Sequence, residues 1–293
     1  QGDFMKKLHK AFLIAALAIS ALALMACSDD DDDSGSSPVS ASLPKSVGTN
    51  EVSGKKFTLT NNSVTFTWDF SDTTAKYTAT SSGNTRIVNY KYTYDQNKGI
   101  LSFGYISVVV NGTTISSVSD YVKMIKQALE AEGETWTSTM SAYYTAETTA
   151  NYKTPDVVKY ALDGTTLKLT PYYFSGTLPT TAGFEVSLNS GYIELTAGDA
   201  GRIKIEDNGT KYYGFPTYSN GTFSGTLYEG HGEKSVGTIA GTYTTSGTGT
   251  SGSTVTLTFT TIPTELTGLE KNKEYTLEQD SSEGNTGSFT LVE

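Results

Sequence analysis

His231 is the only histidine downstream of residue 26, and it is the first residue to consider for catalysis or metal binding. A serine hydrolase needs a histidine beside its nucleophile, and a two-histidine metal site needs a second imidazole. The chain has no Gly-x-Ser-x-Gly sequence to place a nucleophilic serine on a strand-to-helix turn. Because Gly230 and Gly232 flank the histidine, we expect His231 to lie on an exposed loop, solvated and not catalytic.

Carboxylates offer two further chemistries. A glycosidase needs two carboxyl groups at a separation set by the fold, and the candidates are Asp69, Glu185, Glu194 and Glu206. Each lies in an alternating apolar and polar run, so we expect these side chains to face outward from half-buried strands. The segment Asp95-x-Asn97-x-Gly99 begins like a calcium loop, but its twelfth position is Ile106 instead of glutamate. We therefore expect a β-turn there, and no metal or other cofactor.

Cys27 is the only cysteine of the chain, and it follows an apolar run over residues 11–25. Lys6, Lys7 and Lys10 precede this run, whose fifteen residues fall short of the roughly 20 that a transmembrane helix needs. The sequence Leu24-Met25-Ala26-Cys27 resembles the lipobox of bacterial lipoproteins. This resemblance implies cleavage after residue 26, lipidation of Cys27 and attachment to a bacterial outer membrane. Cleavage at a plain small-residue site is the alternative.

An acidic tether follows the cysteine. Five consecutive carboxylates cannot pack together, so we expect solvated chain over residues 27–50. Beyond a spacer role, the acidic run resembles the export signal of surface lipoproteins in Bacteroidota, which implies display on the cell surface. A calcium site is disfavoured because the run lacks the alternating spacing and turn glycine of a calcium loop. The proposed sorting signal consists of Asp29, Asp30, Asp31, Asp32 and Asp33.

The charge balance argues against nucleic acid as a partner. Removal of residues 1–26 leaves 18 basic and 30 acidic residues, a net charge of −12, and the only arginines are Arg86 and Arg202. If Cys27 is lipidated, no cysteine remains for a disulfide, a thiol nucleophile or a zinc site.

Period-two alternation and frequent turn residues predict a mainly β fold, either an antiparallel meander or barrel or a sandwich. The clearest strand carries Val64, Phe66, Trp68 and Phe70 on one face. We count about sixteen strands, seven or eight on each side of Pro171. We expect two tandem units, with a first β domain over residues 51–174 and a second over residues 175–293, and one large β unit is the alternative.

A helical insertion interrupts the first β region over residues 117–150. Apolar residues at helical spacing, a capping serine at Ser117 or Ser119 and Gly133 after the last turn predict a first helix over residues 117–132. A second, threonine-rich helix follows from Trp136 to Glu147. We expect the pair to cover one end or face of the sheet, or else to form a lid over a ligand cavity.

Residues 90–103 and 160–169 share a tyrosine strand, a turn and a leucine strand. These hairpins resemble those of small lipocalin-like domains of exported bacterial proteins, although the Gly-x-Trp opening of lipocalins is absent. The resemblance covers residues 50–175 at most and implies a ligand-binding barrel.

The abundance of tyrosine has two possible interpretations. Neighbouring pairs such as Tyr212-Tyr213 must point their rings to opposite faces of a strand, so we expect some rings to be exposed, where they can stack on sugars or anchor a protein. The alternative is that tyrosine is simply a good strand former.

These features favour a surface-anchored, non-enzymatic lipoprotein whose β domains bind an extracellular glycan, a small apolar molecule or a protein partner. The alternatives are a structural or adhesive surface protein and, third, a carboxylate-dependent glycosidase.

Overall fold

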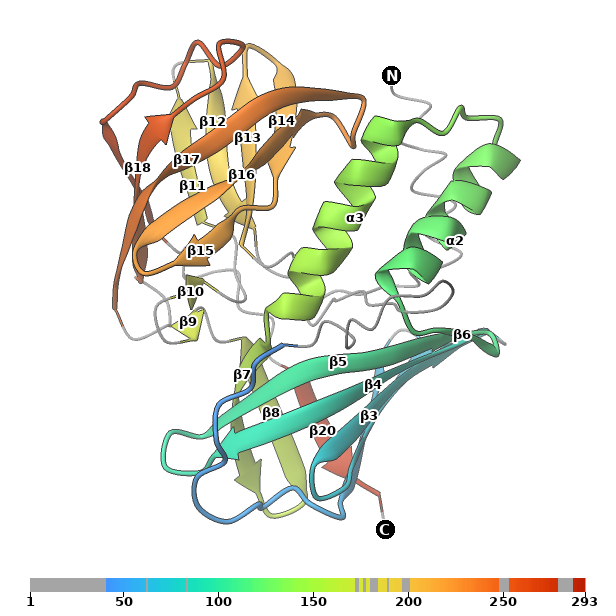
Figure 1. The fold of residues 1–293 in the computed structure, drawn as a ribbon. Helices are drawn as coiled ribbons and strands as arrows, with labels where there is room; N and C mark the ends of the chain where they lie inside the picture. Colours follow the sequence, from blue (N-terminus) through green and yellow to red (C-terminus); the bar gives the residue numbers. More distant parts are fainter. Residues whose placement is uncertain are drawn as a thin grey trace. The chain divides into compact units, whose positions relative to one another are not determined.

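The chain forms two compact units, each built around a closed β-sheet (Figure 1). The computed structural model describes residues 41–61, 63–82, 84–171, 174–175, 178–179, 184–188, 190–196, 201–247, 253–278 and 287–292. Unit 1 comprises the described residues up to Thr137, Val158–Thr170 and the described C-terminal residues 287–292. Unit 2 comprises Ser138–Val157 and the described residues of Pro171–Gly284. The predicted mainly β fold is confirmed.

Barrel 1, in unit 1, is a ring of eight strands. Each strand pairs with the next in the order given, and the last pairs with the first, so the ring has no free edge. The strands are β1 (Lys56–Asn61), β2 (Val64–Phe70), β3 (Thr74–Ser81), β4 (Asn84–Asp95), β5 (Ile100–Val110), β7 (Asp156–Asp163), β8 (Thr166–Pro171) and β20 (Gly287–Leu291). The short strand β6 (Thr113–Ile115) pairs with β5 outside the ring.

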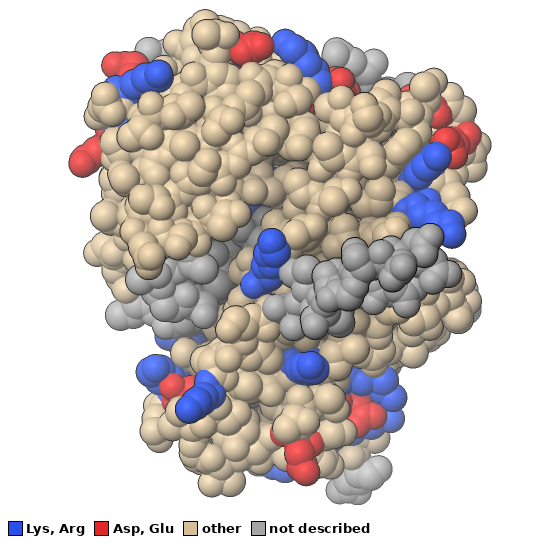
Figure 2. Space-filling model, viewed as in Figure 1, with Lys and Arg blue, Asp and Glu red and all other residues tan. Residues whose placement is uncertain are grey.

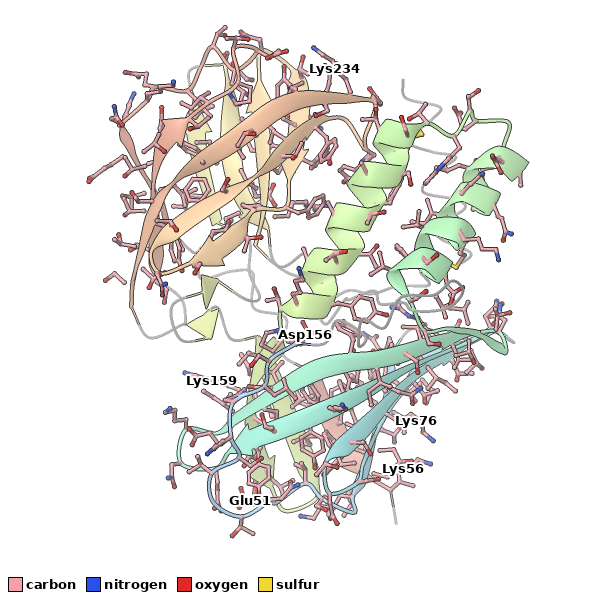
Figure 3. All side chains as sticks on the ribbon, viewed as in Figure 1. Glu51, Lys56, Lys76, Asp156, Lys159 and Lys234 are labelled. Carbon is pink, nitrogen blue, oxygen red and sulfur yellow. The ribbon has the colours of Figure 1, made fainter. Side chains whose placement is uncertain are left out.

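Alternation along the strands separates the interior of barrel 1 from its surface. Trp68 and Phe70 are buried on the inner side of β2, as predicted, and Phe57 faces Trp68 from β1. Lys56 and Lys76 project outward from β1 and β3 (Figure 3). The interior of barrel 1 is therefore a largely aromatic core.

Barrel 2, in unit 2, is also a ring of eight strands, and all its neighbours are antiparallel. The strands in ring order are β11 (Phe184–Leu188), β12 (Gly191–Thr196), β13 (Arg202–Asp207), β14 (Thr210–Gly214), β16 (Thr222–Glu229), β17 (Lys234–Ser246), β18 (Thr254–Thr261) and β19 (Glu274–Glu278). Pairing of Glu185 with Glu278 closes the ring. Strand β15 (Thr217–Ser219) pairs with β16, and β9 (Phe174–Ser175) forms a separate hairpin with β10 (Leu178–Pro179).

A loop between β18 and β19 is tied to barrel 2 through a buried carboxylate. Leu266 and Leu269 from this loop are buried in the same core cluster as the inward-facing residues of barrel 2. Asp207, at the end of β13, is 2% exposed and accepts a hydrogen bond from the Gly268 amide at 2.8 Å. Asp207 also accepts from Ser190 Oγ and Asn208 Nδ2, so its carboxylate joins the loop to the β11–β12 and β13–β14 turns.

Two helices occupy the predicted helical insertion. Helix α2 (Val118–Ala131) begins at Ser117, whose Oγ accepts from the Asp120 amide at 3.1 Å, and it buries Tyr121, Ile125 and Leu129. Helix α3 (Ser138–Lys153) forms despite its threonines, and its buried side is lined mainly by tyrosine, threonine and asparagine. The contacts of α3 with barrel 2 replace the apolar stripe that would otherwise stabilise such a helix. No helix in the described parts of the chain has the length and apolar character needed to cross a membrane.

The division of the chain departs from the predicted one at two places. Strand β20, which we assigned to the second domain, completes barrel 1 between β1 and β8, where Phe289 is 3% exposed. Helix α3, which we assigned to the first domain, belongs to unit 2. The linear division was wrong there because closing the ring of barrel 1 needs a strand that the chain supplies only after barrel 2.

Candidate functional site

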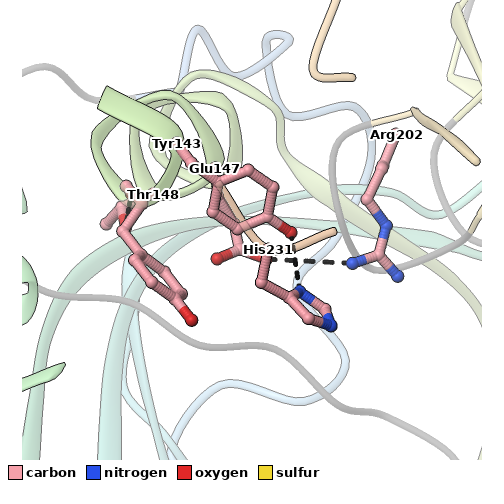
Figure 4. Close-up of polar contacts among 6 residues, drawn as sticks. Tyr143, Glu147, Thr148, Arg202 and His231 are labelled. Atoms are coloured by element: carbon pink, nitrogen blue, oxygen red, sulfur yellow. Dashed lines mark hydrogen bonds and ion pairs between the residues drawn. The ribbon is translucent and has the colours of Figure 1, made fainter. Parts of the chain in front are cut away.

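A cluster of polar and aromatic side chains joins α3 to the outer face of barrel 2 (Figure 4). The Tyr143 hydroxyl hydrogen-bonds with His231 Nδ1 at 3.1 Å, and Tyr143 is completely buried. The His231 ring stacks on Tyr213 with 4.9 Å between centroids. Arg202 lies over the same Tyr213 ring, with its Cζ 5.4 Å from the centroid. Arg202 also forms an ion pair with Glu147 of α3 at 3.8 Å. We call these five residues the α3 cluster.

Local sequence explains this approach of helix and barrel. Tyr143 and Glu147 are four residues apart and therefore share one face of α3. Gly232 has a φ of +91°, and a β-carbon there would lie 2.7 Å from Tyr143 Cβ and 2.9 Å from Met140 Cα. Only glycine permits both that backbone conformation and that close approach of the helix.

The electrostatics of the cluster keep the imidazole neutral. Burial, and then the nearby Arg202 guanidinium, lower the pKa of His231 to about 4. Burial and the Glu147 carboxylate raise the pKa of the adjacent Tyr144 above its usual value. A general base is most effective when its pKa lies near the working pH, so His231 is poorly matched to proton transfer at neutral pH. The α3 cluster instead fixes the helix on barrel 2.

This arrangement overturns the expectation for His231. We predicted a solvated residue on an exposed loop, but the side chain is half-buried between Tyr213 and Tyr143. The flanking glycines gave the wrong indication because the covering residue is 88 positions away in the sequence.

Barrel 1 contains a second feature of interest, an indole surrounded by rings. Trp68 is 4% exposed, and the buried Nε1 donor has no hydrogen-bond partner among the described residues. A buried donor without a partner costs about 1–3 kcal/mol, so native proteins rarely retain one without a reason. The ring centroids nearest to Trp68 lie at 4.8–5.7 Å and belong to Tyr77, Phe103, Phe70 and Tyr90.

The segment 47–54 closes one end of barrel 1. Val52 is 1% exposed, and Asn50 Nδ2 donates to the Tyr92 hydroxyl at 2.8 Å. The Tyr160 hydroxyl donates to Glu51, which lies at this end of barrel 1 in Figure 3. Burial and the Glu51 carboxylate raise the pKa of Tyr160 to about 12, so the phenol stays protonated and keeps this hydrogen bond.

The opposite end of barrel 1, which we call the Arg86 end, is more accessible. Most of its inward-facing side chains are half-buried, and Val64 and Ser81, beside the β1–β2 and β3–β4 turns, are buried. Cross-strand pairs place Ala79 between Phe66 and Arg86. These half-buried residues are Leu59, Phe66, Tyr77, Ala79 and Arg86.

Arg86 brings a positive charge close to this aromatic interior. Arg86 lies on the same face of β4 as Val88 and Tyr90, which are both buried inside the barrel. Burial raises the pKa of Tyr77 to about 12, and the Arg86 charge partly opposes that rise, so the guanidinium and the phenol are neighbours. Phe66 and Tyr77 stack with 6.2 Å between centroids. The Arg86 end can thus offer an apolar molecule both rings and a cation.

The remaining candidate residues do not come together. Asp69, Glu194 and Glu206 form ion pairs with Lys76, Lys204 and Lys211 on neighbouring strands, in keeping with outward orientation. Asp95 accepts from the Lys98 amide in a turn, as predicted. Among the described residues no group of three His, Cys, Asp or Glu side chains could hold a metal ion. Cys27 and Asp29–Asp33 lie outside the described residues, as does the side chain of Glu185.

The tyrosines form no exposed patch in the described parts of the chain. Tyr212 points into the core of barrel 2 while Tyr213 points outward, as the pair rule predicts. The outward ring is nevertheless buried, because it lies in the α3 cluster. The expectation of exposed tyrosine rings is wrong for the described residues.

Comparison with protein-family models, with curated proteins and with solved structures gave no match.

Proposed function

We propose that this chain is a non-enzymatic, lipid-anchored binding protein in which barrel 1 takes up a small apolar molecule through the Arg86 end. The observation that carries the proposal is that side chains are less deeply buried at one end of barrel 1 than at the other. Segment 47–54 closes one end with the buried Val52 and with hydrogen bonds to Tyr92 and Tyr160, whereas most inward-facing residues of the other end are half-buried. An eight-stranded barrel is wide enough to be filled by side chains or to hold one small ligand.

The aromatic interior supports an apolar ligand. Small-molecule sites are lined mainly by apolar and aromatic side chains with a few placed polar groups. Phe66, Tyr77 and Trp68 supply such a lining, and Trp68 Nε1, which has no partner among the described residues, supplies a donor. The resemblance of residues 50–175 to lipocalin-like domains points to the same function.

The test uses N-phenyl-1-naphthylamine, a neutral apolar probe whose fluorescence rises on transfer from water. We expect saturable binding to the chain that begins at residue 27. Ala79→Trp should abolish binding by filling the Arg86 end, whereas Thr80→Trp, on the exposed outer side of the same strand, should leave it unchanged. Equal binding by both variants would place the probe elsewhere and contradict the proposal.

The anchor is part of the proposal. We infer that Cys27 carries the lipid and that Asp29–Asp33 direct the chain to the cell surface. Protease treatment of intact cells tests this, with wild type compared to a variant whose five aspartates are replaced by Ser and Gly. Digestion of wild type and protection of the variant would support surface display. Protection of both would leave the acidic run as a spacer.

A neutral face of barrel 2 favours a second candidate, adhesion to an uncharged glycan. Rows of outward threonines cross β16, β17, β18 and β19, and Thr222, Thr242 and Thr258 form one such row. Thr256 Oγ1 lies 2.9 Å from Thr276 Oγ1 in the next row. Figure 2 shows a broad area without Lys, Arg, Asp or Glu over β16–β18, with charges around its margins. A regular array of hydroxyl and methyl groups fits a neutral, hydroxyl-rich polymer better than a charged one.

Retention on an insoluble neutral glucan tests this candidate. Thr244→Glu should reduce retention because it places a charge in the middle of the neutral face. Thr290→Glu, on the outer side of β20 in barrel 1, is the control. Unchanged retention of both variants, or no retention of wild type, would exclude the neutral face as a glycan surface.

A further inference from the structure

We propose that the ligand of barrel 1 is an apolar molecule that carries an acidic group, which Arg86 binds at the entrance while the apolar body lies toward Trp68. This inference rests on the proposed function and specifies the class of ligand. The chain has only two arginines and a net charge of −10, so an arginine on the inner face of a barrel is unusual for this composition.

The register orders the groups that would contact such a ligand. Ala79 pairs with both Phe66 and Arg86, and this set forms one layer at the Arg86 end, with the buried Val64 and Ser81 nearer the β1–β2 and β3–β4 turns. Tyr77 pairs with both Trp68 and Val88, two residues further along each strand. Two residues of a strand span about 7 Å, so the cation and the indole lie at successive depths.

The chemistry of each layer differs. Arginine offers a planar set of donors that matches a carboxylate or sulfonate, and its charge persists at every relevant pH. The deeper layer is aromatic and contains one donor, Trp68 Nε1, which has no partner among the described residues. A ligand with its acid at the entrance and its rings inside would match both layers, and an acceptor atom on its body could use the indole donor. A neutral ligand would use only the inner layer.

The net negative charge of the chain makes the selection for an acid testable. Without a specific cation, an acidic probe should bind more weakly than its neutral analogue because the protein repels it. Lys76 provides a matched control, since it carries the same charge on an adjacent strand but faces outward and pairs with Asp69. A general electrostatic effect should respond equally to loss of either cation, and a specific contact should respond only to loss of Arg86.

The experiment compares two probes with one ring system, N-phenyl-1-naphthylamine and its sulfonate analogue 8-anilinonaphthalene-1-sulfonate. We expect wild type to bind the sulfonate at least as tightly as the neutral probe. Arg86→Gln should weaken sulfonate binding roughly 10-fold or more, the loss expected for a charge-assisted hydrogen bond, and should weaken neutral-probe binding much less. Arg86→Lys should restore part of the affinity, and Lys76→Gln should change neither.

The outcomes separate the two proposals. One outcome would overturn the acidic ligand and leave the binding function intact. In that outcome Ala79→Trp abolishes binding of the neutral probe, but neither Arg86→Gln nor Arg86→Lys changes binding of the sulfonate. Failure of wild type to bind either probe would overturn both. Circular dichroism melts of each variant show whether the barrel is folded, and raised salt should weaken sulfonate binding to wild type more than neutral-probe binding.

Discussion

At the scale of single residues, His231 makes stability depend on pH. Its pKa is about 4 in the folded chain and near 6.5 when unfolded, so the unfolded state binds more protons between these values. The free energy of unfolding should therefore fall as the pH drops from about 6.5 to 4, with no further loss from this group below 4. The loss should be at most about 3 kcal/mol, because solvent screens part of the effect at a half-buried ring.

A matched variant isolates this contribution from the carboxylates, which also titrate in acid. His231→Asn cannot be protonated in this range. Urea unfolding of wild type and variant at pH 7 and pH 4.5 should show a smaller acid destabilisation for the variant. Parallel pH profiles would mean that His231 does not lose protons on folding, contrary to its place beside Arg202 and Tyr213.

Tyr143 tests the same contact from the helix. Tyr143→Phe keeps the ring packing against Phe215 and Tyr228 but removes the hydroxyl that bonds His231. We expect a loss of about 1 kcal/mol in the free energy of unfolding at pH 7. In His231→Asn the same substitution should cost less, and equal costs in both backgrounds would show that the two side chains are not coupled.

At the scale of elements, Asp207 should determine how firmly the β18–β19 loop is held. Asp207→Ala removes the acceptor of the Gly268 amide and of two side-chain donors, and it should cost about 1–3 kcal/mol in stability. Hydrogen exchange should show faster exchange at Leu266 and Leu269 than in wild type. Asp207→Asn retains one acceptor oxygen, so its stability should lie between those of wild type and Asp207→Ala. Unchanged exchange in Asp207→Ala would mean that burial of the two leucines holds the loop unaided.

Individual elements also show which features of the fold could be predicted from the sequence. The face of β2 with Val64, Trp68 and Phe70 and the start of α2 at Ser117 follow from local periodicity and capping, and the structure has both. The environment of His231 depends on α3, and the Arg86 end depends on which strand faces point inward after closure. Neither is a local property, because a ring of strands brings together residues far apart in the chain. The sequence did contain a signal that Arg86 faces inward, since Arg86, Val88 and Tyr90 occupy alternating positions of one strand.

At the scale of the whole molecule, barrel 2 is inserted in the chain between β8 and β20, so barrel 1 is complete only when the C-terminal strand arrives. Phe289→Ala should cost about 3–5 kcal/mol, the usual loss for a buried phenylalanine. The control Thr290→Ala, at an exposed position of the same strand, should have little effect.

The two tryptophans of the chain, Trp68 and Trp136, both belong to unit 1, so their emission follows that unit. In Phe289→Ala we expect the tryptophan transition in urea to move to lower concentration. Tyrosine-dominated signals report on both units and should then separate into two transitions if barrel 2 keeps its stability. A single, coincident shift of all signals would instead show that insertion couples the two barrels into one cooperative unit, because the loss of one strand would then lower the stability of both.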